Sequence, residues 1–463
     1  MRSPGDILLV SCYELGHQPF QLASLFALLQ QAGYDPAVVD TAIEPLSDET
    51  IRRARFVAIS VPMHTALRLG EQIARRIRSL NGEAHICFYG LYASLNEDYL
   101  LQGLIDSAIG GEFEEPLLKL LAALEHDASA SIPGVSTRQH SSQPWIQRAP
   151  LVVPQRAMLP ALDRYAHLDL NGTAHIAGYT ETTRGCKHTC QHCPITPVYQ
   201  GRFFAIPADL VLADIRAQVE QGAQHIIFGD PDFFNGPTHA MRITRALHHE
   251  FPNITFDATI KIEHLLKHRH LLPELRANGC AFVVSAVESL NDDVLLRLDK
   301  GHTSADISEA FALMEAAGIA LRPSLMPFSP WETLESYLQL LMFFEERHLI
   351  EHVDPVHFSI RLLIPPGSAL LNAPDAQQWL GELDPAAYTY RWRHPDPRMD
   401  DLHRAISELV EKAQRAQADP IETFFHIKAL AFATAGREMC ISCAINDYGT
   451  RKVIPHLTET WFC

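Results

Sequence analysis

The sequence predicts an α/β protein: a doubly wound N-terminal domain, a second domain of parallel strands arranged as in a barrel, and a small, mostly helical C-terminal region. Two patterns carry this prediction. Short apolar runs typical of buried parallel strands alternate with segments of helical period, and the strand-like runs of the second domain end in polar or small residues. The length of 463 residues suits two to three domains, and 47% hydrophobic with 20% charged residues is a globular composition.

The N-terminal domain, residues 1–125, follows from a repeated strand–helix cycle. Strands are predicted at 7–10, 37–40, 56–60 and 84–89, and helices at 22–31 and 66–80. A ligand of such a domain lies beyond the carboxyl ends of the strands, which here means residues 12–17, 62–65 and 90–95. Residues 126–178 are predicted to be a linker, since the stretch to 154 is rich in Ser, Ala, Gln, Pro and His without a sustained period.

The second domain is predicted over residues 179–375. Its strand signals lie at 225–228, 255–260, 282–285, 321–326 and 357–363. Polar strand ends are what a parallel barrel with its site at the C-terminal face should show. The C-terminal region, 376–463, carries a predicted helix at 399–418.

A cysteine loop opens the second domain. Cys186, Cys190 and Cys193 are spaced Cys-x3-Cys-x2-Cys. Thiolates suit zinc or iron–sulfur clusters, and a structural zinc site is normally closed by four ligands. Three clustered cysteines therefore favour a cluster with one iron left open, while a zinc knuckle completed by His188 or His192 stays as the alternative.

This spacing resembles the radical SAM superfamily. The resemblance implies a partial (βα)6 barrel in which the three cysteines hold a 4Fe–4S cluster, and S-adenosylmethionine (SAM) binds the open iron. It implies reductive cleavage of SAM to a 5′-deoxyadenosyl radical, an electron donor such as flavodoxin or ferredoxin, and a small-molecule or peptide substrate. His192 stands where the family usually has an aromatic residue before the last cysteine.

Three strand ends resemble further elements of that superfamily, which implies that their residues contact SAM. Asp230 and Glu288 are the acidic members, although a solvated strand-end carboxylate is the alternative for both. A glycine of the family pattern is replaced by Ala286. The full predicted cofactor-binding set is Gly229, Asp230, Pro231, Glu288, Ser289 and Arg361. A polar cluster of Lys261, Glu263 and His264 is expected either to face the substrate or to cap a helix.

The N-terminal half resembles the cobalamin-binding domain that precedes many radical SAM cores. Residues 105–114 match its ending, an aspartate, two hydrophobic residues and Gly-Glu-x-Glu. The Asp-x-His-x-x-Gly motif of base-off cobalamin binders is absent, so the resemblance leaves cobalamin open. His17 and His64 are expected to be loop histidines rather than cobalt ligands.

The C-terminal region adds three cysteines. Cys440 and Cys443 form a Cys-x2-Cys pair that could bind a second metal or undergo redox chemistry. The ending Trp461-Phe462-Cys463 resembles an uncharacterised bacterial radical SAM group whose tail reads Trp-Tyr-Cys, then Cys or selenocysteine, then Ala-Glu-Pro. Our hypothesis is a selenoprotein-like tail lost at a UGA codon or by truncation, and sequencing the gene past codon 463 tests it.

Charge and composition exclude several classes. A formal net charge of −17 argues against nucleic acid as the main partner, because phosphate neutralisation needs basic surface. No apolar run approaches the ~20 residues that span a bilayer. We therefore expect a cytoplasmic protein with no membrane partner, and cysteines that are thiols or ligands rather than disulfides.

The leading prediction is a radical SAM enzyme, performing methyl transfer if cobalamin binds. A tRNA methylthiotransferase is the enzyme alternative, although that family carries three cluster cysteines in its N-terminal domain, where this chain offers Cys12 and Cys87. A metal- or cluster-binding protein without turnover is the non-enzyme alternative.

Overall fold

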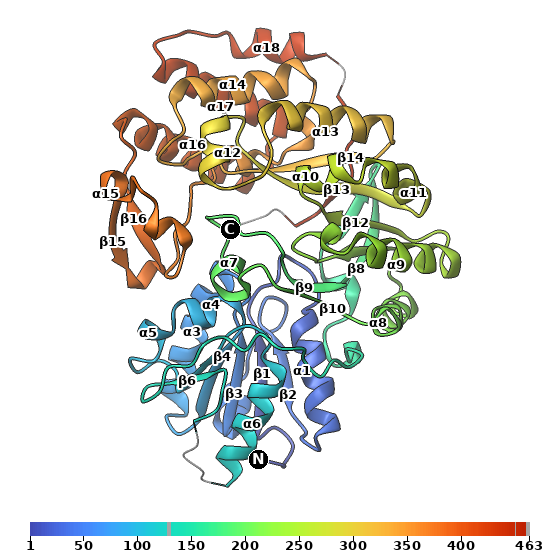
Figure 1. Ribbon diagram of the computed structural model, residues 1–463, viewed down its shortest axis with the longest axis vertical. Helices are drawn as coiled ribbons and strands as arrows, with labels where there is room; N and C mark the ends of the chain where they lie inside the picture. Colours follow the sequence, from blue (N-terminus) through green and yellow to red (C-terminus); the bar gives the residue numbers. More distant parts are fainter. Residues whose placement is uncertain (127–130, 450, 460–463) are drawn as a thin grey trace.

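The protein, described as a computed structural model over residues 1–126, 131–449 and 451–459, consists of two α/β domains and a helical C-terminal region (Figure 1). The predicted fold class is confirmed. The N-terminal domain contains a six-stranded sheet, and the second domain contains a seven-stranded sheet that curls as a partial barrel (Figure 1).

The N-terminal sheet has the strand order β2-β1-β3-β4-β5-β6, parallel except for β6. The strand order reverses between β1 and β3, and ligands of doubly wound sheets bind at that point. Two apolar cores cover the two faces of the sheet, one under α1 and α6 and the other under α3. The elements are β1 (Ile7–Ser11), α1 (Phe20–Gln31), β2 (Ala37–Asp40), α2 (Asp48–Arg53), β3 (Phe56–Ser60), α3 (His64–Leu80), β4 (His85–Tyr89), α4 (Leu91–Leu95), α5 (Glu97–Leu100), β5 (Ser107–Ile109), α6 (Glu114–Glu125) and β6 (Val135–Thr137).

The second sheet has the order β14-β13-β12-β11-β8-β7-β17. Its strands from β8 to β14 are parallel, whereas β7 and β17 are antiparallel additions at one edge. Helices α8, α9, α10, α11 and α13 lie between successive parallel strands in the chain. The elements are β7 (His167–Leu170), β8 (Thr173–Thr180), α8 (Ala208–Glu220), β11 (His225–Phe228), α9 (Pro237–Glu250), β12 (Thr255–Thr259), α10 (Ile262–Lys267), α11 (Leu272–Ala277), β13 (Cys280–Glu288), α12 (Asp292–Arg297), α13 (Ser304–Ala316), β14 (Ala320–Leu325) and α14 (Leu334–Glu346).

The prediction of a parallel strand at 357–363 is wrong. Pro355–Phe358 forms a 3₁₀ turn instead, and only an isolated bridge joins Phe328 to Arg361. Pro355 removes a backbone donor and favours a turn, and Phe358 is buried against the C-terminal helices rather than along the sheet. The apolar pattern of this segment reflects burial, not a strand.

The predicted linker connects the two domains but also contributes strands to both. β6 extends the N-terminal sheet, while β7 and most of β8 belong to the second sheet. Between them, Arg156 is buried and pairs with Asp214 of α8 at 2.8 Å. Its guanidinium also donates to the carbonyl oxygen of Tyr179 at 2.7 Å and of Gln18 at 3.3 Å, so it ties both domains together.

Helices α16 (Pro397–Arg415), α17 (Pro420–Thr434) and α18 (Ile441–Tyr448) of the C-terminal region pack with α14 against the outside of the barrel (Figure 1). A hairpin of β15 (Leu380–Asp384) and β16 (Thr389–Trp392) stands beside them. The short strand β17 (His456–Leu457) then returns to pair with β7. Within the described residues, none of the helices combines the length and apolarity that a bilayer crossing requires.

Candidate active site at the cysteine loop

The cysteine loop begins at β9 (Thr183–Gly185), a strand that pairs with β10 (Phe203–Ala205), and ends in α7 (Ile195–Tyr199). Gly185 has φ +75°, and a Cβ there would lie 2.5 Å from the carbonyl oxygen of Arg202. Only glycine fits this left-handed, close-packed position. The chain can therefore turn sharply into Cys186.

The three predicted cluster cysteines gather in this loop. Cys186 and Cys190 are buried, and Cys193 is partly exposed. Burial raises the pKa of the Cys186 thiol and raises that of Cys193 to about 12, and in both cases the charge of Cys190 adds to the effect. The Nζ of Lys261 lies 3.9 Å from the Sγ of Cys190. A bound cationic cluster would offset the cost of ionising these three thiols, so the donor set fits an iron–sulfur cluster.

Glu288 connects the end of β13 to the cysteine loop. Its backbone is left-handed, with φ +64°, and its carboxylate contacts Lys300 Nζ at 3.0 Å and His192 Nε2 at 3.3 Å. Burial opposes ionisation, but Lys300 and His192 hold the pKa of Glu288 well below its usual range. His192, which departs from the family's aromatic residue, thus anchors the loop through its contact with the buried Glu288 carboxylate.

The residues predicted to contact SAM at the end of β11, Gly229, Asp230 and Pro231, have different surroundings. Both oxygens of Asp230 already accept hydrogen bonds, from the Thr182 amide at 3.0 Å and from the hydroxyls of Thr182 and Thr183 at 2.7 and 2.6 Å. Asp230 therefore fixes the turn between β8 and β9. A Cβ on Gly229 would collide with the Tyr179 ring, so Gly229 is required by packing, and Pro231 lines a small cavity beside it.

The side chains of Ser289 and Arg361 interact with residues outside the cysteine loop. The Ser289 hydroxyl donates to Glu332 at 2.6 Å. Arg361 pairs with Asp400 of α16 at 2.7 Å and stacks over Trp392 at 3.6 Å. Of the predicted cofactor-binding side chains, the structure thus joins Glu288 directly to the cysteine loop and places Arg361 with the C-terminal helices.

The Gly-Glu-x-Glu stretch of the N-terminal domain has a structural role that the sequence analysis missed. Arg184, two residues before Cys186, forms buried ion pairs with Glu112, at 3.2 Å, and with Glu114. Tyr199 of α7 donates to Glu112 at 2.8 Å, and Glu181 lies 3.2 Å from the Arg184 guanidinium. The motif therefore holds both ends of the cysteine loop against the N-terminal domain.

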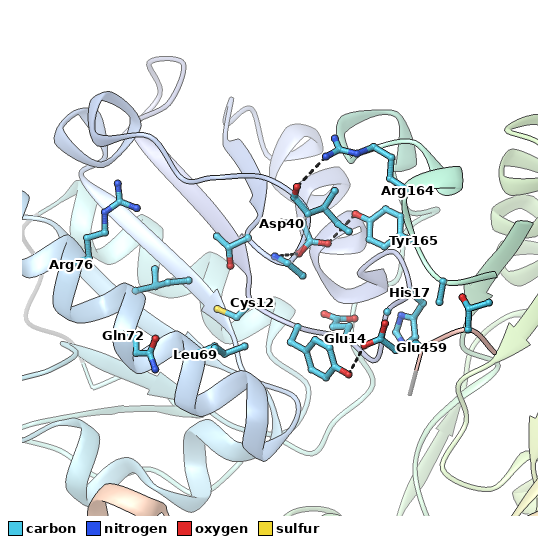
Figure 2. Close-up of a pocket in the computed structure, with 18 residues that line it drawn as sticks. Cys12, Glu14, His17, Asp40, Leu69, Gln72, Arg76, Arg164, Tyr165 and Glu459 are labelled. Atoms are coloured by element: carbon cyan, nitrogen blue, oxygen red, sulfur yellow. Dashed lines mark hydrogen bonds between the residues drawn. The ribbon is translucent and has the colours of Figure 1, made fainter. Parts of the chain in front are cut away.

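A cavity of about 720 Å³ opens at the carboxyl ends of β1 and β2 (Figure 2). Cys12, Glu14, His17 and Asp40 line it, and Tyr165 donates to Asp40 at 2.9 Å. The ring of His17 stacks on Tyr179 of the barrel at 3.6 Å, and burial lowers the pKa of His17 to about 3. His17 is therefore neutral and wedged between the domains.

A second cavity of about 180 Å³ adjoins the first, since Glu14, His17 and Glu459 line both. Its other lining residues come from the inside of the barrel, including Asp257 of β12 and Val284 of β13. The predicted ligand-binding loops 12–17 and 62–65 border these spaces, and Gly90 and Leu91 of the third loop line a smaller one. The interdomain space thus connects the N-terminal sheet with the barrel.

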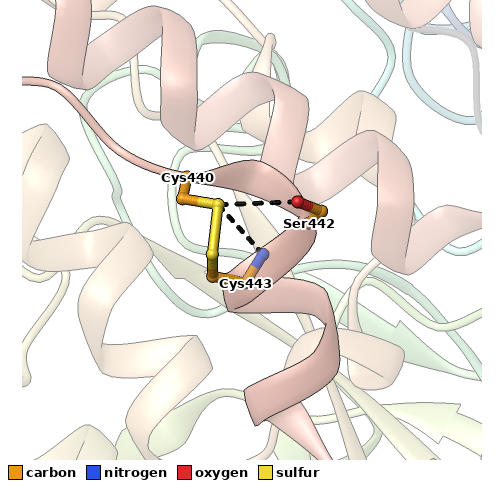
Figure 3. Close-up of a disulfide and its surroundings, with 3 residues drawn as sticks. All are labelled: Cys440, Ser442 and Cys443. Carbon is orange, nitrogen blue, oxygen red and sulfur yellow. Dashed lines mark hydrogen bonds between the residues drawn. A yellow bond between two sulfur atoms is a disulfide. The ribbon is translucent and has the colours of Figure 1, made fainter.

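Cys440 and Cys443 form a disulfide at the start of α18, where the Cys443 amide donates to the Cys440 sulfur at 3.3 Å (Figure 3). The expectation that the chain's cysteines are not in disulfides is wrong for this pair. Cys463 and the proposed tail lie outside the described residues.

Residues 180–341 match the family model described as Radical SAM superfamily. A ribosomal protein uS12 methylthiotransferase RimO of Geobacter sulfurreducens is 28% identical over 192 residues, which cover 38% of this chain and 41% of RimO. RimO of Parabacteroides distasonis is 26% identical over 177 residues, covering 36% of this chain and 41% of its own. The similarity therefore spans less than half of these relatives.

Two solved structures share the fold over both domains. The cobalamin-dependent S-adenosylmethionine radical enzyme OxsB with aqua-cobalamin bound superposes with a TM-score of 0.71 at 14% identity, covering 96% of this chain and 75% of OxsB. The radical S-adenosylmethionine methyltransferase TsrM from Kitasatospora setae, with cobalamin and a [4Fe-4S] cluster bound, gives 0.58 at 17% identity, covering 74% and 70%. The matched segment contains the cysteine loop and the parallel strands β11 to β14, so this part of the chain is similar to the radical SAM superfamily.

Proposed function

We propose that this protein is a radical SAM enzyme that acts on a small or peptidyl substrate with the help of cobalamin. The observation that carries the proposal is the pair of adjoining cavities, which reach from the switch point of the N-terminal sheet into the barrel. A cofactor held by the N-terminal domain would there meet a substrate held in the barrel. The likeness in fold to OxsB and TsrM supports this arrangement.

In this proposal Cys186, Cys190 and Cys193 hold a 4Fe–4S cluster, and Lys261 and the Glu288–Lys300 pair set the charge around it. When bound, the cluster and SAM supply a strong hydrogen-abstracting radical, and cobalamin supplies a methyl group. The chain's own residues orient and seal the site. Arg184 and its three carboxylates fix the loop, and the buried Glu14 and His17 close the interdomain space to water.

The test is anaerobic. The reconstituted protein is given SAM and a strong reductant, and 5′-deoxyadenosine is measured. We expect product from the parent chain and from Cys280→Ala, a buried cysteine of β13 outside the loop, and none from Cys190→Ala. A protein that carries four irons but never cleaves SAM, even with candidate substrates, would leave only the metal-binding alternative.

Cobalamin is tested separately. Leu69 of α3 lines the large cavity, so Leu69→Trp should abolish cobalamin binding, measured by its absorption after gel filtration. Leu296→Trp is the control, because this leucine is 79% exposed and distant in sequence from the cavity. Equal cobalamin retention by both variants would refute the cavity as its site.

A methylthiotransferase is the second candidate, and the RimO matches favour it. That function would need a second cluster in the N-terminal domain. Cys12 and Cys87 are both buried there, and burial raises the pKa of each to about 12. Residues 1–125 contain no third cysteine, so a second cluster there would lack one thiolate of a three-cysteine set. About eight irons per chain after reconstitution, the content of two 4Fe–4S clusters, would favour the methylthiotransferase.

A further inference from the structure

A compact group of His188, Asp232 and His264 lies beside the cysteine loop. One ligand atom from each residue falls within 4.8 Å of the others. His264 Nδ1 is 2.6 Å, and His188 Nε2 is 3.3 Å, from Oδ2 of Asp232. The side chains of Asp232 and His264 are 0% and 1% exposed, whereas that of His188 is 15% exposed.

Three different segments bring these residues together. His188 belongs to the cysteine loop, Asp232 precedes the 3₁₀ turn Phe233–Asn235 after β11, and His264 lies on α10 after β12. The other oxygen of Asp232 accepts the Phe234 amide at 3.2 Å, which fixes the carboxylate. The group therefore lies at the carboxyl edge of the barrel, and a backbone hydrogen bond holds its carboxylate in place.

The polar contacts of the group are made among its own members. His188 Nε2, His264 Nδ1 and Asp232 Oδ2 are all buried, and apart from their contacts with one another they have no hydrogen-bond partner. A buried polar atom without a partner costs roughly 1–3 kcal/mol. Three ligand atoms that converge on one point in this way suit a bound cation.

The second nitrogen of His188 supports this explanation. His188 Nδ1 lies 3.8 Å from the carboxylate of Glu263. If Nε2 carried the only ring proton, the lone pair of Nδ1 would face that negative charge. If Nε2 instead binds a metal, Nδ1 carries the proton and points it toward Glu263, the carboxylate–histidine–metal arrangement that orients metal-binding histidines.

We propose that His188, Asp232 and His264 bind a divalent transition metal next to the cluster cysteines. Two imidazoles and one carboxylate suit Zn²⁺ or Fe²⁺ and leave coordination positions open. The bound ion would fasten the cysteine loop to the ends of β11 and β12. It would be a second metal centre, distinct from the one that the thiols hold.

The experiment uses the full chain with Cys186, Cys190 and Cys193 changed to Ala and with Cys440, Cys443 and Cys463 changed to Ser, so that the thiols left, those of Cys12, Cys87 and Cys280, are buried. Titration with Co²⁺ should give one ion per chain and visible d–d absorption, without a sulfur-to-metal charge-transfer band. Adding His264→Gln or Asp232→Asn should weaken binding by at least about 100-fold, since even outer partners of a metal site are worth 10–100-fold. His268→Ala, one helical turn from His264, should bind like the parent.

A second measurement uses the wild-type protein with all of its cysteines. Elemental analysis of the purified wild-type protein should find one zinc or one additional iron beyond the cluster iron, and His264→Gln should lose that ion selectively. Absent Co²⁺ binding in a variant with native circular dichroism would overturn the proposal. So would unchanged binding in both His264→Gln and Asp232→Asn, or a thiolate band in the Co²⁺ titration of this cysteine variant.

Discussion

The buried pair of Arg156 and Asp214 makes a quantitative prediction about how the two domains are held together. Their side chains are 0% and 1% exposed, and two hydrogen bonds of 2.9 and 2.8 Å join them. Changing Arg156 to Met leaves the Asp214 carboxylate buried with only the Gln218 amide, at 3.1 Å, as a side-chain partner. Breaking one half of a buried ion pair typically costs about 3–5 kcal/mol, and we expect a loss of unfolding free energy in that range.

Urea unfolding followed by circular dichroism measures this loss. The shift of the midpoint, multiplied by the shared m value, gives the change in free energy for the transition that includes α8. The control is Arg164→Met, which removes an exposed pair with Glu44 and should cost no more than about 1 kcal/mol. The double variant Arg156→Met, Asp214→Leu should recover most of the loss, because neither charge remains buried. If Arg156→Met costs no more than Arg164→Met, the pair does not hold the domains together.

Three further predictions concern the cysteine loop and its surroundings. Burial raises the pKa of Glu181 to about 7, against about 4.3 in the unfolded chain, so the folded protein binds this proton more tightly and its stability falls as pH rises from 4.5 to 7. Glu181→Gln should therefore gain stability relative to the parent as pH rises from 5 to 8, and a pH-independent difference in urea midpoint would contradict this. Gly185→Ala should lower the iron bound after reconstitution, whereas Gly172→Ala, with φ +78° and nothing within 4 Å of a new Cβ, should not; equal iron contents would show that the close contact at 185 is unimportant. The double variant Cys440→Ser, Cys443→Ser should keep its iron content and SAM cleavage, because this exposed pair is bonded to itself, and a loss of iron would instead make it a cluster ligand.

Much of the fold could be read from the sequence because buried parallel strands have a strong local signal. The strands at 56–60 and 225–228 were predicted with the bounds they have in the structure. The segment 357–363 was not, because burial against helices produces the same apolar pattern as a strand. The strand β7 was missed since its His-Leu-Asp-Leu sequence is half polar, as expected of a strand near the sheet edge.

Residues of the candidate site were predictable only where their spacing in the sequence forms a recognisable ligand motif. The three cysteines lie within eight residues, so their spacing alone identifies them as a set of metal ligands. Asp232 and Arg184, in contrast, gain their importance from partners 30 or more residues away, His264 in one case and Glu112 in the other. Such pairs arise from the packing of separate elements. Sequence patterns of local period do not contain that information.

The strand β17 has a consequence for how the protein is made. His456 and Leu457 complete the edge of the second sheet, and Glu459 reaches across to accept a hydrogen bond from Tyr13 at 3.0 Å. Domains fold as they leave the ribosome, N-terminal first. Strand β17 and Glu459 can therefore join the two domains only after residue 459 has left the ribosome. Until then the interdomain cavity lacks the part of its lining that Glu459 supplies. A partly synthesised chain therefore has both domains, but the cavity between them is open on that side.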